Sequence, residues 1–414
     1  MLKDQLINYM KTFETEHIDF DLFVTFEHVL VHENNFKAVN YSDEQGIRDL
    51  LEYLGRAGWE LIEEDGVLVG CKKDKETIRL GLGGQVQWTY GPFFQMQDLD
   101  QAYLNFIETL FDELRRRGMI LLATGHQPVS ASSDIEVVPT AENKCMMEYA
   151  GNNAALVDYL TSSAKTSVSF KYAHVDNYEK RYQAAMIIQP ALAAFFDNAA
   201  WVEGKENTKP LYNLNNLLTA DESLYHVEDT LSNSFKYRDF ADFLMYAPAV
   251  AMKDGDKLVY AGDKKVEDIF ADGVSEDDVK RILRTVKPMI SMDEHGMTIT
   301  NVDSVPYPLN MAYVLLVRAL LYSPDHITAL QKMIEEMKEE NIVTAHQETL
   351  QKGLKAPMGE GTTFDLMKDL FFMITLTVGP KEQHYLQPLN ALLFKGITTK
   401  GVSAKQFANM MANA

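Results

Sequence analysis

The stretch that decides the fold class is LIEEDGVLVGCKKDKETIRLGLGGQVQWTY, residues 61–90. Within it, Leu61–Cys71 and Glu76–Leu80 are rich in apolar and β-branched residues, and the charged segment Lys72–Lys75 separates them. This pattern is typical of two strands joined by a turn, and Gln85–Tyr90 predicts a further strand. Strands joined by short turns pair in antiparallel fashion, so the stretch predicts an antiparallel sheet.

The residues on either side extend this sheet and add two helices. Phe20–Val31 is rich in Phe, Val and Leu with alternation, which predicts a strand. Ser42 with Gln45 resembles a capping box at the start of a helix. The apolar face of that helix is Ile47, Leu50, Leu51 and Leu54. The apolar face of the next helix is Leu104, Ile107, Leu110, Phe111 and Leu114, and the cations and glycine of Arg115–Gly118 end it.

The remaining chain turns from strands to helices. Met119–Ala123 and Thr166–Tyr172 predict strands, and Tyr178–Phe196 predicts a long helix with a kink at Pro190. After about Ser234 the expected elements are mostly helices: Glu276–Arg284, Pro308–Leu321, His326–Glu340 and Phe364–Thr377. This order predicts an α+β fold, with an antiparallel sheet covered by helices on one side.

No repeat or Pro/Ser-rich linker marks a domain boundary. We therefore expect one domain over residues 1–414, in which 1–233 is mainly sheet plus helices and 234–414 is mainly helical.

Composition excludes several classes of protein. Lys plus Arg total 39 against 60 Asp plus Glu, a formal net charge of −21, which does not favour a nucleic-acid partner. Two cysteines, Cys71 and Cys145, without Cys-x-x-Cys spacing, predict neither a disulfide framework nor a thiolate metal site. The sequence has no signal-peptide pattern and no apolar run of roughly 18 residues, so we expect a cytoplasmic protein without a membrane partner.

Three stretches, read in order, carry a family resemblance. The first contains Thr25–Val29, Gly81–Gln87 and Gly125–Pro128, followed by Asp134, Ile135 and Pro139. The second, and the most specific, is Gln189-Pro190 with Phe196–Lys205. The third runs from Ser234-Phe235 through Tyr246-Ala247-Pro248, with Asp303 and Pro306-Tyr307 further on. Together they resemble the glutamate-cysteine ligase family of the plant and bacterial type, which implies a glutamine-synthetase-like fold with a sheet cleft.

The resemblance implies a defined chemistry. Members of that family join the γ-carboxylate of glutamate to the amine of cysteine through a γ-glutamyl phosphate made from ATP. ATP and Mg²⁺ are therefore the implied cofactors. Magnesium takes oxygen ligands, so several carboxylates must converge, and arginines must meet the phosphates and the substrate carboxylate.

This chain departs from the family pattern at its charged positions. Of the strand motif Glu-x-Glu it keeps Glu27 but has Val29 at the second acid. The acidic ends of Glu-Pro-Gly-Gly-Gln-Phe-Glu are Gly81 and Gln87, and Gln-x-Asn-x-Asp becomes Ser167, Ser169 and Lys171. Thr298 and Thr300 replace a Glu-x-Arg pair, Asn213 replaces one arginine, and Glu142 and Met147 replace others.

Two functional hypotheses follow, each with its own residues. In the first, the chain has lost or altered ATP/Mg²⁺-dependent γ-glutamyl ligation, needs no cofactor, and binds an amino-acid-like small molecule or a partner enzyme. The alternative is an active ATP-dependent carboxylate-amine ligase with a rearranged metal site. Its oxygen ligands would come from Glu27, Asp197, Glu203 and Asp303, and Lys165, Lys171 or Lys205 would meet the phosphate. An ATP-independent acyl transfer lacks support, because neither cysteine has an identifiable His partner.

The candidate catalytic residues are Glu27, Lys171 and Asp303, and Glu27 is also the candidate metal ligand. The candidate binding residues are Gly83, Gly84, Gln85, His126, Asn198, Glu203 and Lys205. Structural roles compete with each: Glu27 as an ion-pair partner, Gly83-Gly84 as a turn, and Asp197, Glu203 and Lys205 as a solvated helix end. His28 and His32 lie about 13 Å apart on one strand face, too far to share a metal ion.

Overall fold

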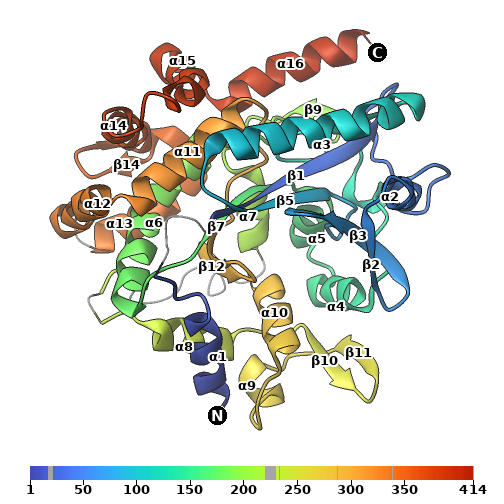
Figure 1. Cartoon of the computed structure of the whole chain (residues 1–414), viewed down its shortest axis with the longest axis horizontal. Helices are drawn as coiled ribbons and strands as arrows, with labels where there is room; N and C mark the ends of the chain where they lie inside the picture. The colour runs from blue at the N-terminus through green and yellow to red at the C-terminus, as the bar shows by residue number, and fades with distance from the viewer. Residues whose placement is uncertain (17–21, 220–229, 233, 287, 338, 414) are drawn as a thin grey trace.

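An antiparallel sheet forms the centre of the molecule (Figure 1). The computed structural model describes residues 1–16, 22–219, 230–232, 234–286, 288–337 and 339–413. In these residues the sheet has nine strands in the order β12-β13-β7-β1-β5-β4-β3-β2, with β6 paired to β1 off this path. The strands are β1 Leu22–His32, β2 Glu60–Glu64, β3 Val67–Lys73, β4 Glu76–Leu80, β5 Val86–Phe93, β6 Met119–Leu122, β7 Thr166–Phe170, β12 Ile290–Asp293 and β13 Gly296–Ile299.

The helices and small hairpins surround this sheet. The helices are α1 Leu2–Lys11, α2 Ile47–Arg56, α3 Met96–Arg116, α4 Ala141–Ala150, α5 Ala154–Ser162, α6 Val175–Phe195, α7 Tyr212–Leu218, α8 Tyr237–Tyr246, α9 Val266–Ile269, α10 Glu276–Thr285, α11 Leu309–Tyr322, α12 Pro324–Met337, α13 Glu339–Lys352, α14 Thr363–Thr375, α15 Gln387–Lys395 and α16 Thr399–Asn413. The hairpins are β8 Trp201–Val202 with β9 Lys205–Glu206, β10 Ala251–Asp254 with β11 Lys257–Tyr260, and β14 Pro357–Met358 with β15 Gly361–Thr362.

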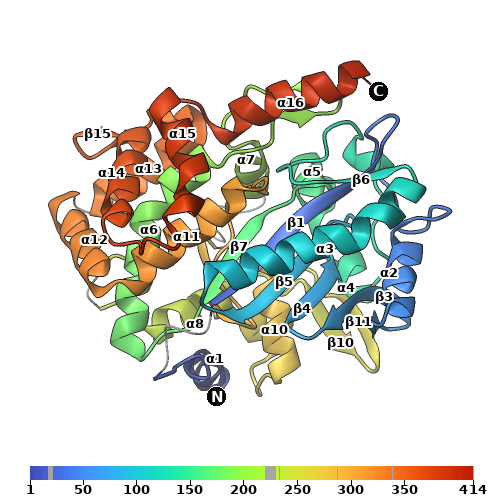
Figure 2. The ribbon, with the colours of Figure 1, turned by 45° about the horizontal axis from the view of Figure 1, so that its top comes forward.

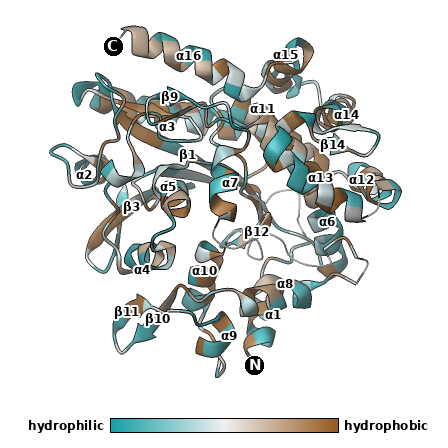
Figure 3. Ribbon diagram, turned by 180° about the vertical axis from the view of Figure 1, so that it is seen from behind, coloured by the Kyte–Doolittle hydropathy of each residue, from teal (hydrophilic) through white to brown (hydrophobic). Residues whose placement is uncertain are grey.

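The two faces of the sheet have different chemistry because side chains alternate along each strand. On one face, Phe26 and Trp88 pack against Tyr103 and Phe106 of α3 in the main apolar core. On the other face, Glu27 of β1 lies opposite Gln87 of β5. Helices α4, α5, α7 and α10 lie on this second side (Figure 3), whereas α3 crosses the first (Figures 1 and 2).

The predicted α+β fold with a large antiparallel sheet is confirmed. The expectation that helices cover one side is wrong, because α3 and the α4–α5–α7 group lie on opposite faces. The part after residue 233 is rich in helices, as expected, but it also supplies β12 and β13, and β13 pairs with β7. Pro190 lies inside α6.

Several predicted boundaries are corrected. Leu61–Cys71 is two strands, β2 and β3, because Asp65 and Gly66 adopt positive φ angles of 50° and 77° and form a turn. The predicted capping box is wrong, since the Ser42 hydroxyl donates to Glu136 at 2.8 Å and Gly46 precedes α2. Residues Phe20 and Asp21 of the first predicted strand lie outside the described residues.

The predicted helix His326–Glu340 corresponds to α12 and the start of α13, and Lys338 between them lies outside the described residues. Among the described helices, none is long and apolar enough to cross a membrane.

Candidate functional site

A cavity of about 260 Å³ lies between the polar sheet face and helices α4, α5, α7 and α10. Its floor is polar and is formed by Glu27, Gln85, Gln87, Ser163 and Lys165. Its wall is apolar and comes from the helices: Met146, Tyr149, Leu156, Leu160, Leu217 and Leu218. The cavity therefore has its buried charges on the sheet side, beside Leu80 and Leu82, and most of its apolar surface on the helix side, where Glu142, Asn143, Arg284 and Thr285 of α4 and α10 add polar groups.

Glu27 and Lys165 form the charged inner end of this cavity. Glu27 is 7% exposed, and its Oε1 accepts a hydrogen bond from Gln87 Nε2 at 3.1 Å. Its Oε2 accepts from the backbone N–H of Lys165, also at 3.1 Å. Lys165 Nζ donates to the Tyr159 hydroxyl at 2.9 Å. Burial acts to lower the pKa of Lys165, but the adjacent Tyr159 and Glu27 outweigh it and raise that pKa, so the side chain is a cation.

A second ion pair lies at the rim. Arg284 of α10 donates to Glu142 of α4 through Nε at 3.0 Å and Nη2 at 2.7 Å. Arg281 lies close as well, with its Nε 3.7 Å from Glu142 Oε2. Burial acts to lower the pKa of Arg284, but the hydrogen bonds and charge of Glu142 raise it. The Arg284 side chain is 50% exposed, which places this pair at the mouth of the cavity.

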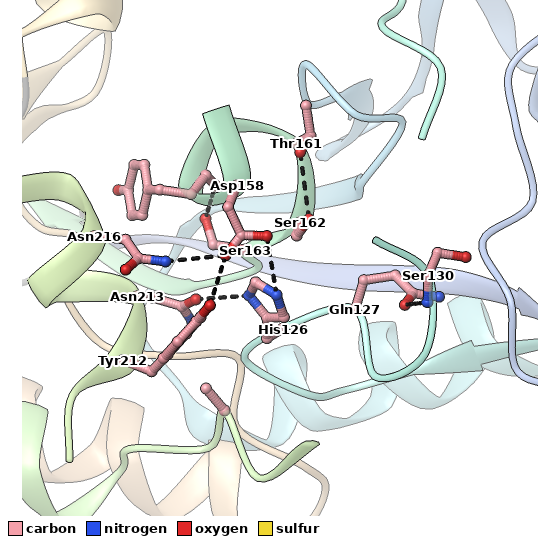
Figure 4. A network of polar contacts seen from close by, with 12 residues as sticks. His126, Gln127, Ser130, Asp158, Thr161, Ser162, Ser163, Tyr212, Asn213 and Asn216 are labelled. Carbon is pink, nitrogen blue, oxygen red and sulfur yellow. Dashed lines mark hydrogen bonds and ion pairs between the residues drawn. The ribbon is translucent and has the colours of Figure 1, made fainter. Parts of the chain in front are cut away.

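Behind the cavity, a polar network centres on His126 and Asp158 (Figure 4). His126 Nδ1 lies 2.8 Å from Asn213 Oδ1, and its Nε2 lies 3.5 Å from Asp158 Oδ1. Asp158 Oδ2 accepts from the Tyr212 hydroxyl at 3.0 Å and from Asn216 Nδ2 at 2.9 Å. Burial acts to raise the pKa of Asp158, but its hydrogen bond to His126 and the charge of that ring lower it. The network ties α5 and α7 to the loop after β6.

Asp303 lies deeper, beside a cavity of about 20 Å³ that Lys165 and Tyr159 also line. Its oxygens accept from the Asn198 backbone N–H and from Asn213 Nδ2, both at 2.8 Å. Burial, and then the charge of Asp197, raise the pKa of Asp303 to about 6. Lys400 of α16 reaches this region, with its Nζ 3.3 Å from Asp197 Oδ2.

The glycine-rich stretch has a structural role. Gln85 Nε2 donates to the carbonyls of Thr161 at 2.9 Å and Ser163 at 3.0 Å, and its Oε1 accepts from the Gly83 N–H at 3.0 Å. A Cβ on Gly83 would lie 2.0 Å from the Thr161 carbonyl oxygen, and Gly84 has a φ of +81°. These residues hold the β4–β5 turn against the end of α5.

The other predicted site residues lie in different surroundings. Asn198 is buried and donates from Nδ2 to the Ser304 carbonyl at 2.7 Å. Glu203 and Lys205 are exposed at the β8–β9 hairpin. Lys171 directly follows β7, and neither it nor the hairpin residues line the two cavities. His28 lies on the α3 side of the sheet, 2.8 Å from the Tyr103 hydroxyl.

The donor set does not fit a magnesium clamp. Among the described residues, no group of three or more His, Cys, Asp or Glu side chains could hold a metal ion, so Glu27, Asp197, Glu203 and Asp303 do not form one. Val29 packs in a small apolar cluster with Val31 and Phe36.

Ser169 and Thr298, at two other positions where the resemblance predicts charged residues, hydrogen-bond to protein groups. The Ser169 hydroxyl donates to Asp293 at 2.6 Å, and the Thr298 hydroxyl donates to Ser169 at 2.9 Å.

Residues 24–210 match the sequence model of glutamate-cysteine ligase family 2. Over this region the chain is similar to the glutamate-cysteine ligase family. It is 21% identical over 374 residues to the chloroplastic glutamate-cysteine ligase A of Oryza sativa subsp. japonica, covering 85% of this chain and 74% of the relative. It is 20% identical over 387 residues to the chloroplastic enzyme of Arabidopsis thaliana, covering 88% and 72%. The predicted family resemblance is thereby confirmed.

Sequence reasoning missed three features of this site. Arg284, Leu217 and Leu218 lie outside residues 24–210, so the family pattern carries no signal for them. Tyr159 lies within the matched region, but the sequence pattern did not predict it as a partner of Lys165. The helical spacing of Leu156 and Leu160 was a signal that α5 presents one apolar face.

Proposed function

We propose that this family member binds a small amino-acid-like molecule in the cavity and does not carry out Mg²⁺-dependent γ-glutamyl ligation. The observation that carries this proposal is that both carboxylate oxygens of Glu27 are already hydrogen-bonded to protein groups. Among the described residues, Glu27 is the single acid on the cavity floor, and each of its oxygens accepts a hydrogen bond from the protein. A magnesium ion bound there would have to be dehydrated with few anionic oxygens to replace its water.

The size of the cavity supports the same function. Its volume of about 260 Å³ lies below the roughly 300–1,000 Å³ of pockets that enclose drug-sized ligands. An amino acid fits in such a space, whereas ATP together with two amino acids does not.

The charges at the inner end match a zwitterion. Lys165 offers a cation to a carboxylate, and Glu27 offers an anion to an ammonium group. Both side chains line the same cavity, and the charge of Glu27 acts to raise the pKa of Lys165, so the two charged groups lie near each other. A ligand that carries both charges on neighbouring atoms can therefore contact both residues.

Calorimetric titration of the full chain tests the proposal. We expect saturable binding of an amino acid without nucleotide, unchanged by a chelator, and no binding of ATP with MgCl₂. Lys165→Met should reduce amino-acid binding at least tenfold, and Lys205→Met, on the exposed hairpin, serves as the matched control. Chelator-sensitive micromolar ATP binding, or ATP hydrolysis that requires both magnesium and an amino acid, would contradict the proposal and favour the active-ligase alternative.

A further inference from the structure

We infer that the molecule held in this cavity is an amino acid with an apolar side chain, of the size of leucine or methionine, and not glutamate. This inference rests on the function proposed above and specifies its ligand. It is carried by the contrast between the polar floor and the apolar wall of one cavity.

The wall presents apolar surface that the described residues leave partly uncovered. Met146, Leu160, Leu217 and Leu218 line the cavity and are only partly buried, and Leu156 is buried behind them. Leu160 and Leu217 belong to the edge of a small apolar cluster formed with Leu156 and Tyr159. Covering such surface with an apolar ligand group removes it from water, which favours binding.

Among the described residues, the leucines and Met146 of the wall offer no cation to a second carboxylate. Among the residues that line the cavity, the cations are Lys165 and Arg284. Lys165 lies at the floor beside Glu27, and Arg284 is already in a two-point pair with Glu142 at the rim. A glutamate placed with its α-carboxylate at Lys165 would direct its γ-carboxylate at leucine side chains, where an unpaired charge is costly.

The geometry therefore assigns each part of the ligand to one side. The α-carboxylate lies against Lys165 and the ammonium against Glu27, both on the sheet side. The side chain then points away from the sheet, because Leu156, Leu160, Leu217 and Leu218 of α5 and α7 line the cavity, and these helices lie beside that face of the sheet (Figure 3).

A ligand series titrated into the full chain tests this assignment. We expect L-leucine and L-methionine to bind at least tenfold more tightly than L-glutamate, and also than L-alanine, which lacks the apolar group. Isoamylamine, which is leucine without its carboxylate, should not bind measurably, because it cannot pair with Lys165. Equal or tighter binding of glutamate would overturn the inference while leaving the proposed function in place. Failure of every amino acid to bind would overturn both.

Variants of the wall provide a second test. Leu160→Arg should weaken leucine binding at least tenfold and strengthen glutamate binding, since it places a cation opposite the floor. Leu376→Arg, at a position 91% exposed directly after α14 and outside the cavity lining, is the matched control and should change neither affinity. If Leu160→Arg does not fold, the milder Leu217→Ala should still weaken leucine binding without affecting alanine. A leucine affinity that neither wall variant changes would contradict the inference.

Discussion

Arg284 and Glu142 lie 142 residues apart in the chain and form a two-point ion pair across the rim of the cavity. The predicted correspondence with the family pattern places an arginine at position 142, where this chain has Glu142. The cation comes from α10, which lies outside the region that matches the family. The charge of Glu142 is thus compensated by a residue that lies outside the matched region.

Reversing Glu142 alone should destabilise the chain. Glu142→Arg would place three guanidinium groups together, since Arg281 and Arg284 both approach this position. Because the pair is partly exposed, we expect a loss of only about 1 kcal/mol in the free energy of unfolding. The double exchange Glu142→Arg with Arg284→Glu should recover most of that loss. Urea unfolding of the four proteins measures the coupling, and additive effects would show that the pair contributes nothing.

Removing the charge of Glu27 should affect stability and leave the response to magnesium unchanged. Glu27→Gln offers one acceptor oxygen to two protein donors, Gln87 Nε2 and the Lys165 N–H. Leaving one of these buried donors unpaired costs about 1–3 kcal/mol. Glu203→Gln, on the exposed hairpin, should stay within about 0.5 kcal/mol of the parent chain. A thermal midpoint of the parent that rises with MgCl₂ and no longer does so in Glu27→Gln would point to a metal at Glu27.

Acid should destabilise the fold through His28. Burial lowers the pKa of His28 from 6.5 to about 4, so the unfolded chain binds the proton more readily than the folded chain. The contribution of neutral His28 to the free energy of unfolding is fully present above pH 6.5 and is lost as the pH falls toward 4. At pH 5 about 2 kcal/mol of it has been lost. His28→Gln should lose less stability than the parent between pH 7 and pH 5 in urea unfolding. Asp303, whose pKa is raised to about 6, acts in the opposite sense, but it is common to both proteins. Equal losses in the two proteins would rule out His28 as a source of the acid sensitivity.

A methyl group at Gly83 should be poorly tolerated. The added Cβ would lie 2.0 Å from the Thr161 carbonyl oxygen, which is backbone and cannot move aside alone. We expect Gly83→Ala to cost about 3 kcal/mol, at the upper end for overpacking. Gly66→Ala is the control, because its Cβ meets nothing within 4 Å and its positive φ costs roughly 1 kcal/mol. Chemical unfolding measures the free energy of unfolding of both variants. If the Gly83→Ala variant is no less stable than the Gly66→Ala variant, the turn geometry is contradicted.

The sequence predicted those parts of the fold that local pattern determines. Glu76–Leu80 was placed correctly because it is a strand bounded by charged turns on one side and glycines on the other. Ile290–Asp293 and Gly296–Ile299 were missed because four residues are too few to show alternation. Strand β13 is stabilised by pairing with β7, which is more than a hundred residues away, and β12 pairs with β13.

The candidate site was predicted unevenly for a similar reason. The resemblance selected Glu27, which does line the cavity, because its motif is local. It also selected Glu203 and Lys205, which the fold carries to an exposed hairpin away from the two cavities. The partners that determine the chemistry of the cavity, Tyr159 for Lys165 and Arg284 for Glu142, depend on how helices pack and cannot be read from one segment.

The position of β7 between β1 and β13 has a consequence for biosynthesis. As the chain leaves the ribosome, β7 can pair with β1 early, but its second edge stays open until residues 296–299 have been made. An unpaired strand edge is a template for aggregation. Nascent chains that stall after β7 has been made and before β13 has been made should therefore depend on chaperones. A fragment ending near residue 233 would keep that open edge permanently.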